Sequence, residues 1–486
     1  MFQTLKNAWK TQELKTKLLF TLLIVILYRI GCNIPVPWVD GNAVSAFFGQ
    51  SFGAMQLMLG DAFSQANLFA LSVSPYITSS IIMQLLTIAI PALERMAKDG
   101  EAGKKKIAMI TRIVTVVLAV ITSVGYSLTL VYGQSAYTGH PLANLGETNE
   151  VFAICVMSAC FCAGAAIVMW LAEKINEFGI GNGISIILFA NIIARLPSVV
   201  GNFKTMLLGE WSWFGDPVDG AIGLVADDAS GENIATLIFN IVWVLLIIAF
   251  LVGVVWLIVW FNDSERRIPV QYAKKVVGRK MYGGQSSNLP LKLNMAGVMP
   301  VIFANSIVSI PETLSRIFGT NASWLATLAT DYFHYTKPLY VLISIIVLFA
   351  FAYFYIMISF NPVEVANNIR NNGGAVPGIR PGKPTSDYIR KILNRITFIG
   401  AVFLCAVSEI PKMIVAIFST LSEVSVVVGE NAVLDWINRF YGTGHYSFIT
   451  LAFAGTSVLI VVGVILETVR ELEAQLTLRN YKGFLD

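Results

Sequence analysis

Side chains that could act as acids, bases or ion ligands are scarce in the apolar stretches of this sequence. The three histidines lie in the hydrophilic segments between those stretches. Arg29 and Arg195 stand near the ends of apolar stretches, and Glu409 stands one turn from an end. A proton relay or a coupling-ion site in a membrane needs such groups at mid-depth. The sequence therefore predicts neither.

Patterns for catalysis and metal binding are also missing from the sequence. It has no glycine loop of the kind that cradles phosphate, no metal-ligand spacing and no paired nucleophile and base. The five cysteines lie within apolar stretches, where thiols usually serve as small core side chains. They are Cys32, Cys155, Cys160, Cys162 and Cys405. We therefore expect a protein that is not an enzyme and that has no cofactor and no metal.

The polar groups that the apolar stretches do contain are amides and hydroxyls. Such groups form hydrogen bonds between membrane helices, worth about 0.6 kcal/mol each on average. A polar seam between two helices that must separate would use the same residue types. The residues are Thr78, Ser79, Ser80, Gln84, Asn182, Asn191, Asn294, Asn305 and Ser306.

Composition places the elements that carry these groups in a membrane. The chain has 486 residues, of which 56% are hydrophobic and only 13% charged, and its mean hydropathy is +0.68. Soluble domains are roughly 25% charged. A membrane-spanning helix needs roughly 20 apolar residues, and ten stretches approach that scale. They are Leu18–Ile34, Leu68–Ile90, Ile113–Tyr132, Val151–Ala172, Ile184–Val200, Ile234–Phe261, Leu293–Ile310, Pro338–Phe360, Ile396–Ile410 and Ser447–Leu466.

The distribution of lysine and arginine predicts the orientation of ten such helices. With the N-terminus inside, 27 of the 34 basic residues fall in inside segments and 7 in outside segments. Inside loops of membrane proteins carry the excess of Lys and Arg. The sequence therefore predicts a multi-pass protein with both termini in the cytoplasm. Its basic lead before residue 18 indicates a retained anchor rather than a cleaved signal.

Four connections between the stretches are unusual. Two long basic loops, 262–292 and 361–395, are expected on the cytoplasmic side. The outer connection 411–446 contains an apolar run, Met413–Phe418, that could lie on the membrane surface. The segment 52–66 is apolar but too short to span. It is either an amphipathic helix on the outer surface or a re-entrant stretch shielded in a water-filled cavity.

Five ordered blocks of residues resemble the signatures of the SecY family, the main subunit of the bacterial protein-conducting channel. The blocks run from the second apolar stretch to the tail, so the resemblance covers nearly the whole chain. The sequence departs from the family at Asn67, where a smaller residue is usual, and in its long outer connection 411–446. The blocks are LFALSVSPYITSSIIMQLL (Leu68–Leu86), WLAEKINEFGIGNGISIIL (Trp170–Leu188), LPLKLNMAGVMPVIFA (Leu289–Ala304), PGIRPG (Pro377–Gly382) and RNYKGF (Arg479–Phe484).

The resemblance implies an all-α multi-pass membrane protein, a single channel domain over residues 1–486. Two pseudo-symmetric five-helix halves, 1–200 and 234–486, would surround a central pore and be joined by the outer loop 201–233. A ring of aliphatic side chains would narrow the pore at its midpoint. The resemblance places that ring on Val73, Ile77, Ile184, Leu188, Ile302 and Ile460.

The resemblance also implies moving parts around the pore. The re-entrant stretch becomes a plug that seals the resting channel. A lateral gate between the second and seventh helices would open toward lipid, with Gln84, Asn305 and Ser80 as its polar residues. The plug residues are Met55, Leu57, Met58, Leu59, Gly60, Asp61 and Phe63.

The basic cytoplasmic loops become a docking surface for the translocation ATPase SecA and for ribosomal RNA. Without the resemblance, these charges need no partner beyond lipid headgroups. The docking residues are Arg266, Arg267, Lys274, Lys275, Arg279, Lys280 and Arg380.

The resemblance further implies small SecE and SecG membrane subunits, and signal peptides and nascent chains as cargo. The implied function is to pass unfolded secretory proteins across the bacterial plasma membrane and to release hydrophobic segments into lipid. Two other classes stay open on the residues alone. A secondary transporter for a small solute would need a buried ion ligand, and a membrane enzyme would need a paired acid and base or a metal site.

Overall fold

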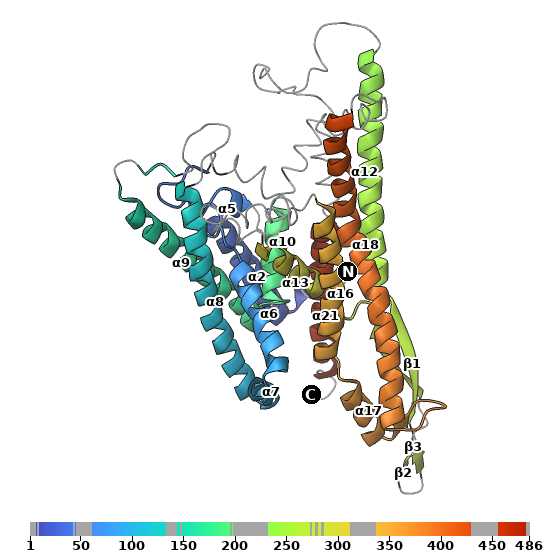
Figure 1. The fold of residues 1–486 in the computed structure, drawn as a ribbon. Coiled ribbons are helices and arrows are strands. Elements are labelled where there is room, and N and C mark those ends of the chain that lie inside the picture. Colours follow the sequence, from blue (N-terminus) through green and yellow to red (C-terminus); the bar gives the residue numbers. More distant parts are fainter. Residues whose placement is uncertain are drawn as a thin grey trace.

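In a computed structural model, the chain forms a bundle of long apolar helices from which a β-hairpin projects at one end (Figure 1). We call that end the hairpin end. The structure describes residues 6, 9–41, 44, 61–132, 143–145, 148–194, 197, 232–272, 275–277, 280–282, 286–311, 337–428 and 455–482.

Helices make up most of the described chain, and each of the ten predicted apolar stretches contains one. The mostly helical architecture that the sequence predicted is what the described residues form. The helices are α2 (Gln12–Gly31), α5 (Asp61–Ser64), α6 (Ser74–Ala89), α7 (Pro91–Lys98), α8 (Gly100–Tyr132), α9 (Glu150–Phe178), α10 (Gly183–Ile193), α12 (Glu232–Asp263), α13 (Met299–Val308), α16 (Pro338–Ser359), α17 (Pro362–Asn371), α18 (Lys383–Val428) and α21 (Gly455–Lys482).

The helices form two groups that meet along a shared centre (Figure 1). The first group contains α2, α6, α8, α9 and α10, with α8 packed on α9 and on α6. The second contains α12, α13, α16, α18 and α21, with α16 packed on α18 and on α13. The main contacts between the groups are α6 with α13 and α10 with α21.

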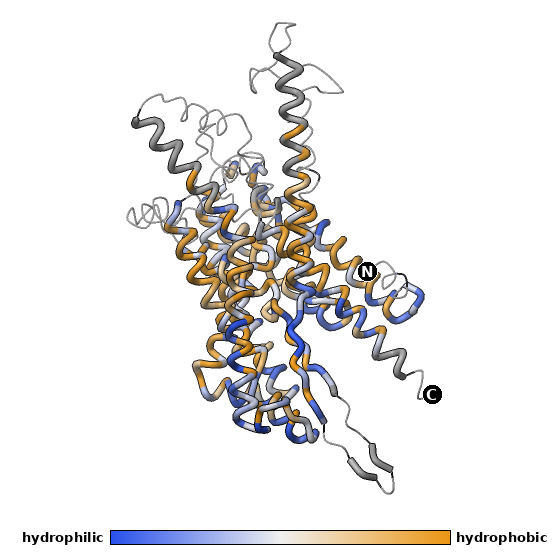
Figure 2. The backbone as a smooth tube through the Cα atoms, turned by 90° about the vertical axis from the view of Figure 1, so that its right-hand side faces the viewer, coloured by the Kyte–Doolittle hydropathy of each residue, from blue (hydrophilic) through white to orange (hydrophobic). Residues whose placement is uncertain are grey.

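The long helices carry apolar residues on their outer surface as well as inside, as expected for helices solvated by lipid. Figure 2 shows hydrophobic residues along the helices and hydrophilic ones gathered toward the hairpin end. Among the described residues, four helices are long and apolar enough to cross a membrane: α8, α9, α18, and α16 taken together with α17. The pair α6 and α7, bent by 105°, would make a fifth.

Several helix ends differ from the sequence prediction. Helix α6 begins at Ser74 rather than Leu68, because Pro75 fits only the first turn of a helix and the residues before it form turns. Helix α10 ends at Ile193, short of Val200. The apolar run Met413–Phe418, placed by the sequence in an outer connection that could lie on the membrane surface, continues α18 past its internal proline.

The two basic loops are more ordered than the sequence indicated. The first contains β1 (Glu265–Tyr272), β2 (Lys275–Val277), β3 (Lys280–Tyr282) and β4 (Ser286–Lys292). Strand β1 pairs antiparallel with β4 in the register Ile268↔Leu289, and its far end pairs with β5 (Gly374–Ala375) of the second loop. The two loops are therefore one structural unit.

The cysteines are free thiols, but they are not all core residues as predicted. Cys32 is buried, and three others are half-buried. Cys155 is exposed on α9, so the prediction of a core thiol is wrong at this position. Its neighbours Val151 and Phe152 are exposed apolar side chains too, which indicates a lipid-facing surface.

Candidate pore, gate and docking surface

The six residues predicted to form the pore ring belong to one hydrophobic cluster that joins the two groups of helices. Five are buried, and Ile184 packs against them half-buried. They come from the start of α6, from α10, from α13 and from α21. The cluster also holds packing residues of other helices, and the assignment of these six to a pore stays a prediction. They are Val73, Ile77, Ile184, Leu188, Ile302 and Ile460.

A buried polar triangle fixes the backbone just before the first ring residue. Ser72 has a φ of +47°, a left-handed conformation that costs energy for a residue with a Cβ. Its Oγ lies 3.0 Å from the Tyr28 hydroxyl and accepts from Asn191 Nδ2 at 3.0 Å. Tyr28 also donates to Asn191 Oδ1 at 2.8 Å. These bonds tie Val73 to both α2 and α10.

The GIGNG motif is a tight connection between α9 and α10, and its glycines are required by geometry. Gly181 has a φ of +85°. A Cβ on Gly183 would lie 2.0 Å from the carbonyl oxygen of Ala172. The side chain of Asn182 accepts from the backbone N–H of Ile184 at 3.0 Å and so caps α10. The motif therefore sets where the two ring residues of α10 lie.

A close approach of α21 to Val298, the residue before α13, accompanies the packing of Ile302 and Ile460 in one cluster. Pro300 lies in the first turn of α13, two residues before Ile302. A Cβ on Gly463 would lie 2.3 Å from Val298 Cγ1, so only a glycine permits this approach. Gly463 and Ile460 are three residues apart on α21 and share a face of the helix.

The side chains of this cluster could exclude water and ions, but they offer no group for catalysis. Its members are aliphatic, aromatic or thiol side chains that carry no charge at neutral pH. Among the described residues, no three His, Cys, Asp or Glu are placed to hold a metal ion. A constriction of branched apolar side chains dewets, and so it refuses ions without a fixed charge.

The end of the predicted plug is anchored in the first group of helices. Of the seven plug residues, Asp61 and Phe63 lie in α5. The ring of Phe63 stacks on that of Tyr126 with centroids 5.1 Å apart, and its carbonyl oxygen accepts from the Tyr126 hydroxyl at 2.5 Å. Ala62 belongs to the hydrophobic cluster that contains the predicted pore-ring residues. The other five, Met55, Leu57, Met58, Leu59 and Gly60, lie outside the described residues.

The predicted gate residues lie on the two helices that join the groups, but they bond elsewhere. Gln84 Nε2 donates to Ser80 Oγ at 3.4 Å within α6. Asn305 Oδ1 on α13 accepts from Lys412 Nζ of α18 at 2.9 Å. The polar contact expected between Gln84 and Asn305 is not formed in this structure, and the gate itself stays a prediction.

A buried ion pair in the second group was missed by the sequence analysis. Lys412 Nζ lies 2.9 Å from Glu409 Oε1, and the Glu409 side chain is only 2% exposed. Lys412 also lies over the ring of Tyr340, 5.9 Å from its centroid. The sequence analysis assigns Lys412 to the outer connection 411–446, whereas α18 continues through it. The i, i+3 spacing of Glu409 and Lys412 was the available signal.

The predicted docking residues lie on the hairpin unit as far as the structure describes them. Arg266 and Arg267 are exposed on β1, and Arg267 Nε pairs with Glu265 Oε1 at 2.7 Å. Arg380 is exposed in the loop before α18. Lys275 lies on β2 and Lys280 on β3, whereas Lys274 and Arg279 are outside the described residues.

A small hydrophobic core supports this basic surface. Ile268 and Val270 of β1 pack with Leu291 of β4 and with residues of α17 and α18. At the base of β4, burial lowers the pKa of Lys292, and the positive charge of Arg470 lowers it further. The base of the hairpin thus brings Lys292 and Arg470 together, with the carboxylates of Asp263 and Glu265 acting in the opposite direction on the pKa.

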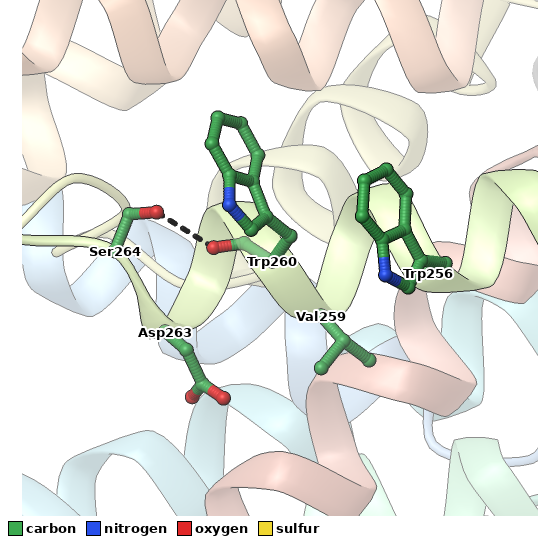
Figure 3. Close-up of a pocket in the computed structure, with 5 residues that line it drawn as sticks. All are labelled: Trp256, Val259, Trp260, Asp263 and Ser264. Carbon is green, nitrogen blue, oxygen red and sulfur yellow. Dashed lines mark hydrogen bonds between the residues drawn. The ribbon is translucent and has the colours of Figure 1, made fainter.

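An open pocket of about 420 Å³ lies where α12 ends and the hairpin begins (Figure 3). The rings of Trp256 and Trp260 stack at 6.5 Å and project from one side of the helix, while Asp263 points to the other (Figure 3). Ser264 Oγ donates to the carbonyl oxygen of Trp260 at 2.7 Å. Tryptophans concentrate at the boundary between lipid and water, and a stacked pair at the end of an apolar helix is typical of that boundary.

Long apolar helices in two groups, with an uncharged apolar cluster between them, are compatible with a membrane channel. Residues 67–469 match the model of the SecY family. The chain is 39% identical to the protein translocase subunit SecY of Streptomyces scabiei over 494 residues, covering 100% of both chains. The chain belongs to the SecY family.

Two solved structures share the fold at lower identity. One is a SecY protein whose plug domain is described as stabilising the closed state of the translocation channel. It has a TM-score of 0.57, 16% identity, and coverage of 95% of this chain and 92% of that one. The other is Sec61 in a canine ribosome–channel complex from the endoplasmic reticulum. Its TM-score is 0.53 at 15% identity, with coverage of 95% and 92%.

Proposed function

We propose that this chain is the pore-forming subunit of a protein translocase in a bacterial plasma membrane. It passes unfolded secretory proteins outward and releases hydrophobic segments sideways into lipid. The observation that carries the proposal is the uncharged cluster, in which residues from both groups of helices meet in a member of the SecY family. The chain supplies no catalytic residue to this function, and the energy comes from its partners.

Whether the pore conducts depends on whether water enters its narrow apolar part. An apolar ring between the helix groups excludes water and ions at rest, because stripping the hydration shell from an ion is costly in so narrow a space. An extended peptide replaces that water with its own atoms and meets no fixed charge that would trap it. Segment 55–67 closes the resting pore as a plug, its far end held by the contact of Phe63 with Tyr126.

Lateral release takes place between α6 and α13. Their contact is a main junction between the groups, and the polar gate residues do not bond across it. Once the seam opens, a segment in the pore partitions by transfer free energy. Leu or Ile favours lipid by about 0.3–0.6 kcal/mol per residue, and Arg or Asp opposes it by about 2.5–3.5 kcal/mol.

The hairpin unit is the docking surface, on the cytoplasmic side. Arg266, Arg267 and Arg380 are exposed there and would attract ribosomal RNA phosphates or acidic surfaces of SecA. The relative in the canine complex is bound to a ribosome by its description, which supports the same role here. SecE and SecG subunits complete the channel.

Reconstitution tests this function directly. The chain is placed in proteoliposomes with a SecE partner and SecA, and a labelled preprotein is added with ATP. We expect the preprotein to become protected from external protease only when ATP is present. An absence of protection, in vesicles where a known bacterial translocase gives it, would overturn the proposal. Uptake of a small labelled solute instead would favour a transporter.

The ring is tested separately by conductance. Replacing Ile77 or Ile184 with Asn places a hydrogen-bonding group in the constriction, so water enters and the resting ion conductance rises in planar bilayers. Ile77→Leu keeps the volume and the apolar surface, and its conductance should equal that of the unmodified channel. Equal conductance for all three variants would remove these residues from the pore.

A further inference from the structure

Two consecutive side chains of α21, Arg470 and Glu471, contact different groups of helices. Arg470 Nη2 donates to the backbone carbonyl of Asn262 at 2.6 Å and to Asp263 Oδ1 at 2.7 Å, where α12 ends. Glu471 Oε2 accepts the backbone N–H of Gly181 at 2.8 Å, in the connection between α9 and α10. One turn of one helix therefore holds both groups of helices.

On the first side, the Glu471 carboxylate is embedded in a set of supporting contacts. Its second oxygen accepts from Gln475 Nε2 at 3.2 Å, and Gln475 in turn accepts from Lys17 Nζ at 3.2 Å. Ile180, next to Gly181, is only 1% exposed and packs with Leu472 of α21. A hydrogen bond from a backbone N–H to a carboxylate is among the stronger kinds.

What Glu471 holds is the connection that leads straight into the ring residues of α10. Gly181 precedes the first residue of α10 by two positions, and Ile184 and Leu188 lie on that short helix. Because α10 is a rigid segment of 11 residues, a shift of the connection moves both side chains together. Helix α21 itself carries Ile460, so the contact relates three of the six ring residues to one another.

On the second side, Arg470 binds the base of the hairpin, where the chain leaves and rejoins the helices; we call this base the root. The chain leaves α12 at Asp263 and returns at Leu293, whose N–H donates to the carbonyl oxygen of Ser264 at 3.0 Å. Asn294 Nδ2 donates to Asn262 Oδ1 at 2.8 Å and closes the same root. A force on the hairpin therefore reaches α21 through Arg470.

We propose that Arg470 and Glu471 are positioning residues that couple the docking hairpin to the pore ring. A macromolecule that binds the hairpin displaces its root, Arg470 transmits the displacement to α21, and Glu471 transmits it to the GIGNG connection and to α10. The inference rests on the proposed function, because it assigns the route by which a docked partner opens the channel.

Ion conductance of the resting channel tests the link from Glu471 to the ring residues of α10. In planar bilayers, with the small membrane subunits present, Glu471→Ala should raise ion conductance roughly tenfold, the change expected on losing a charge-assisted hydrogen bond that favours the closed state. Glu471→Gln keeps an acceptor for the Gly181 N–H and should recover most of the closure. Thr477→Ala removes only a local bond from an exposed residue of the same helix and serves as the matched control.

The change in conductance on binding a partner tests the link from the hairpin to α21 through Arg470. Bacterial ribosomes are added as the probe, and both their binding and the conductance are measured. Arg470→Met should leave ribosome affinity unchanged but abolish the conductance response, whereas Arg470→Lys should keep part of it. Melting temperatures of all variants in detergent, equal to within a few degrees, separate coupling from general loss of structure.

The outcomes distinguish the coupling from the function on which it rests. An unmodified channel that transports a preprotein and responds to ribosomes, together with Glu471→Ala and Arg470→Met variants that behave identically, would overturn the coupling alone. An unmodified chain that neither transports a preprotein nor binds ribosomes would overturn the proposed function and the coupling with it.

Discussion

At the scale of single residues, buried polar groups hold the backbone next to Val73, the first of the predicted ring residues. The triangle of Tyr28, Ser72 and Asn191 satisfies three side chains that are at most 1% exposed. It also supports the left-handed backbone of Ser72, which would otherwise be strained. Removing one member leaves the other two short of a partner in a place that water does not reach.

Tyr28→Phe is expected to destabilise the protein by about 1–3 kcal/mol, because Ser72 and Asn191 lose a buried partner while the ring stays in place. Thermal unfolding in detergent measures the change. Tyr132→Phe is the control, since its hydroxyl makes a 3.4 Å contact with Glu150 at an exposed site. Equal melting temperatures for both variants would contradict the structural role of the triangle.

A second residue-scale prediction concerns the GIGNG motif. Gly183→Ala should destabilise the protein more than Tyr28→Phe does, because its Cβ would collide with backbone at 2.0 Å and cannot be relieved by a rotamer change. Gly253→Ala on α12, where a Cβ meets nothing within 4 Å, should instead stabilise by about 1 kcal/mol through helix propensity. The sign of the difference in melting temperature checks both. A tolerated Gly183→Ala would contradict the close packing of α9 and α10.

At the scale of elements, α18 holds α13 in place through a buried ion pair. Lys412 bonds to Glu409 on its own helix and to Asn305 on α13. Lys412→Met should cost about 3–5 kcal/mol, because it leaves the Glu409 carboxylate buried without its partner. The double variant Glu409→Gln, Lys412→Met should regain most of that loss. Lys174→Met, from an exposed pair with Glu177, is the control and should change stability little.

The same elements show which parts of the fold can be predicted from the sequence. Hydropathy and charge located the helices, and the signature blocks predicted the family, since both depend on local residue order. The strands of the hairpin were missed because short, basic, alternating runs also fit a loop. The course of α18 was missed because a proline usually breaks a helix, whereas Pro411 is accommodated in this one. The triangle around Ser72 joins residues up to 163 positions apart, which no local pattern reveals.

At the scale of the whole molecule, the two junctions between the helix groups differ in kind. The α6–α13 contact has no hydrogen bond between the predicted gate residues. The α10–α21 contact is reinforced at the hairpin end by Glu471 and Gly181 and by the apolar packing of Ile180 on Leu472. The hydrogen bond between Glu471 and Gly181 would have to break on separation along α10 and α21, whereas the predicted gate residues make no such bond across α6 and α13. This asymmetry favours a molecule that opens at one seam while the other acts as its hinge.

The orientation of the whole molecule is open to a direct test. The excess of Lys and Arg at the hairpin end predicts that this end faces the cytoplasm, because basic segments are retained on that side. In a variant freed of its five cysteines, Thr477→Cys reports on the hairpin end and Glu150→Cys on the opposite end, and both positions are exposed. A membrane-impermeant maleimide should label Thr477→Cys only in inverted vesicles and Glu150→Cys only in intact cells. The reverse pattern would invert the assignment of the docking surface, since a hairpin on the outer side could meet neither ribosomes nor a cytoplasmic ATPase.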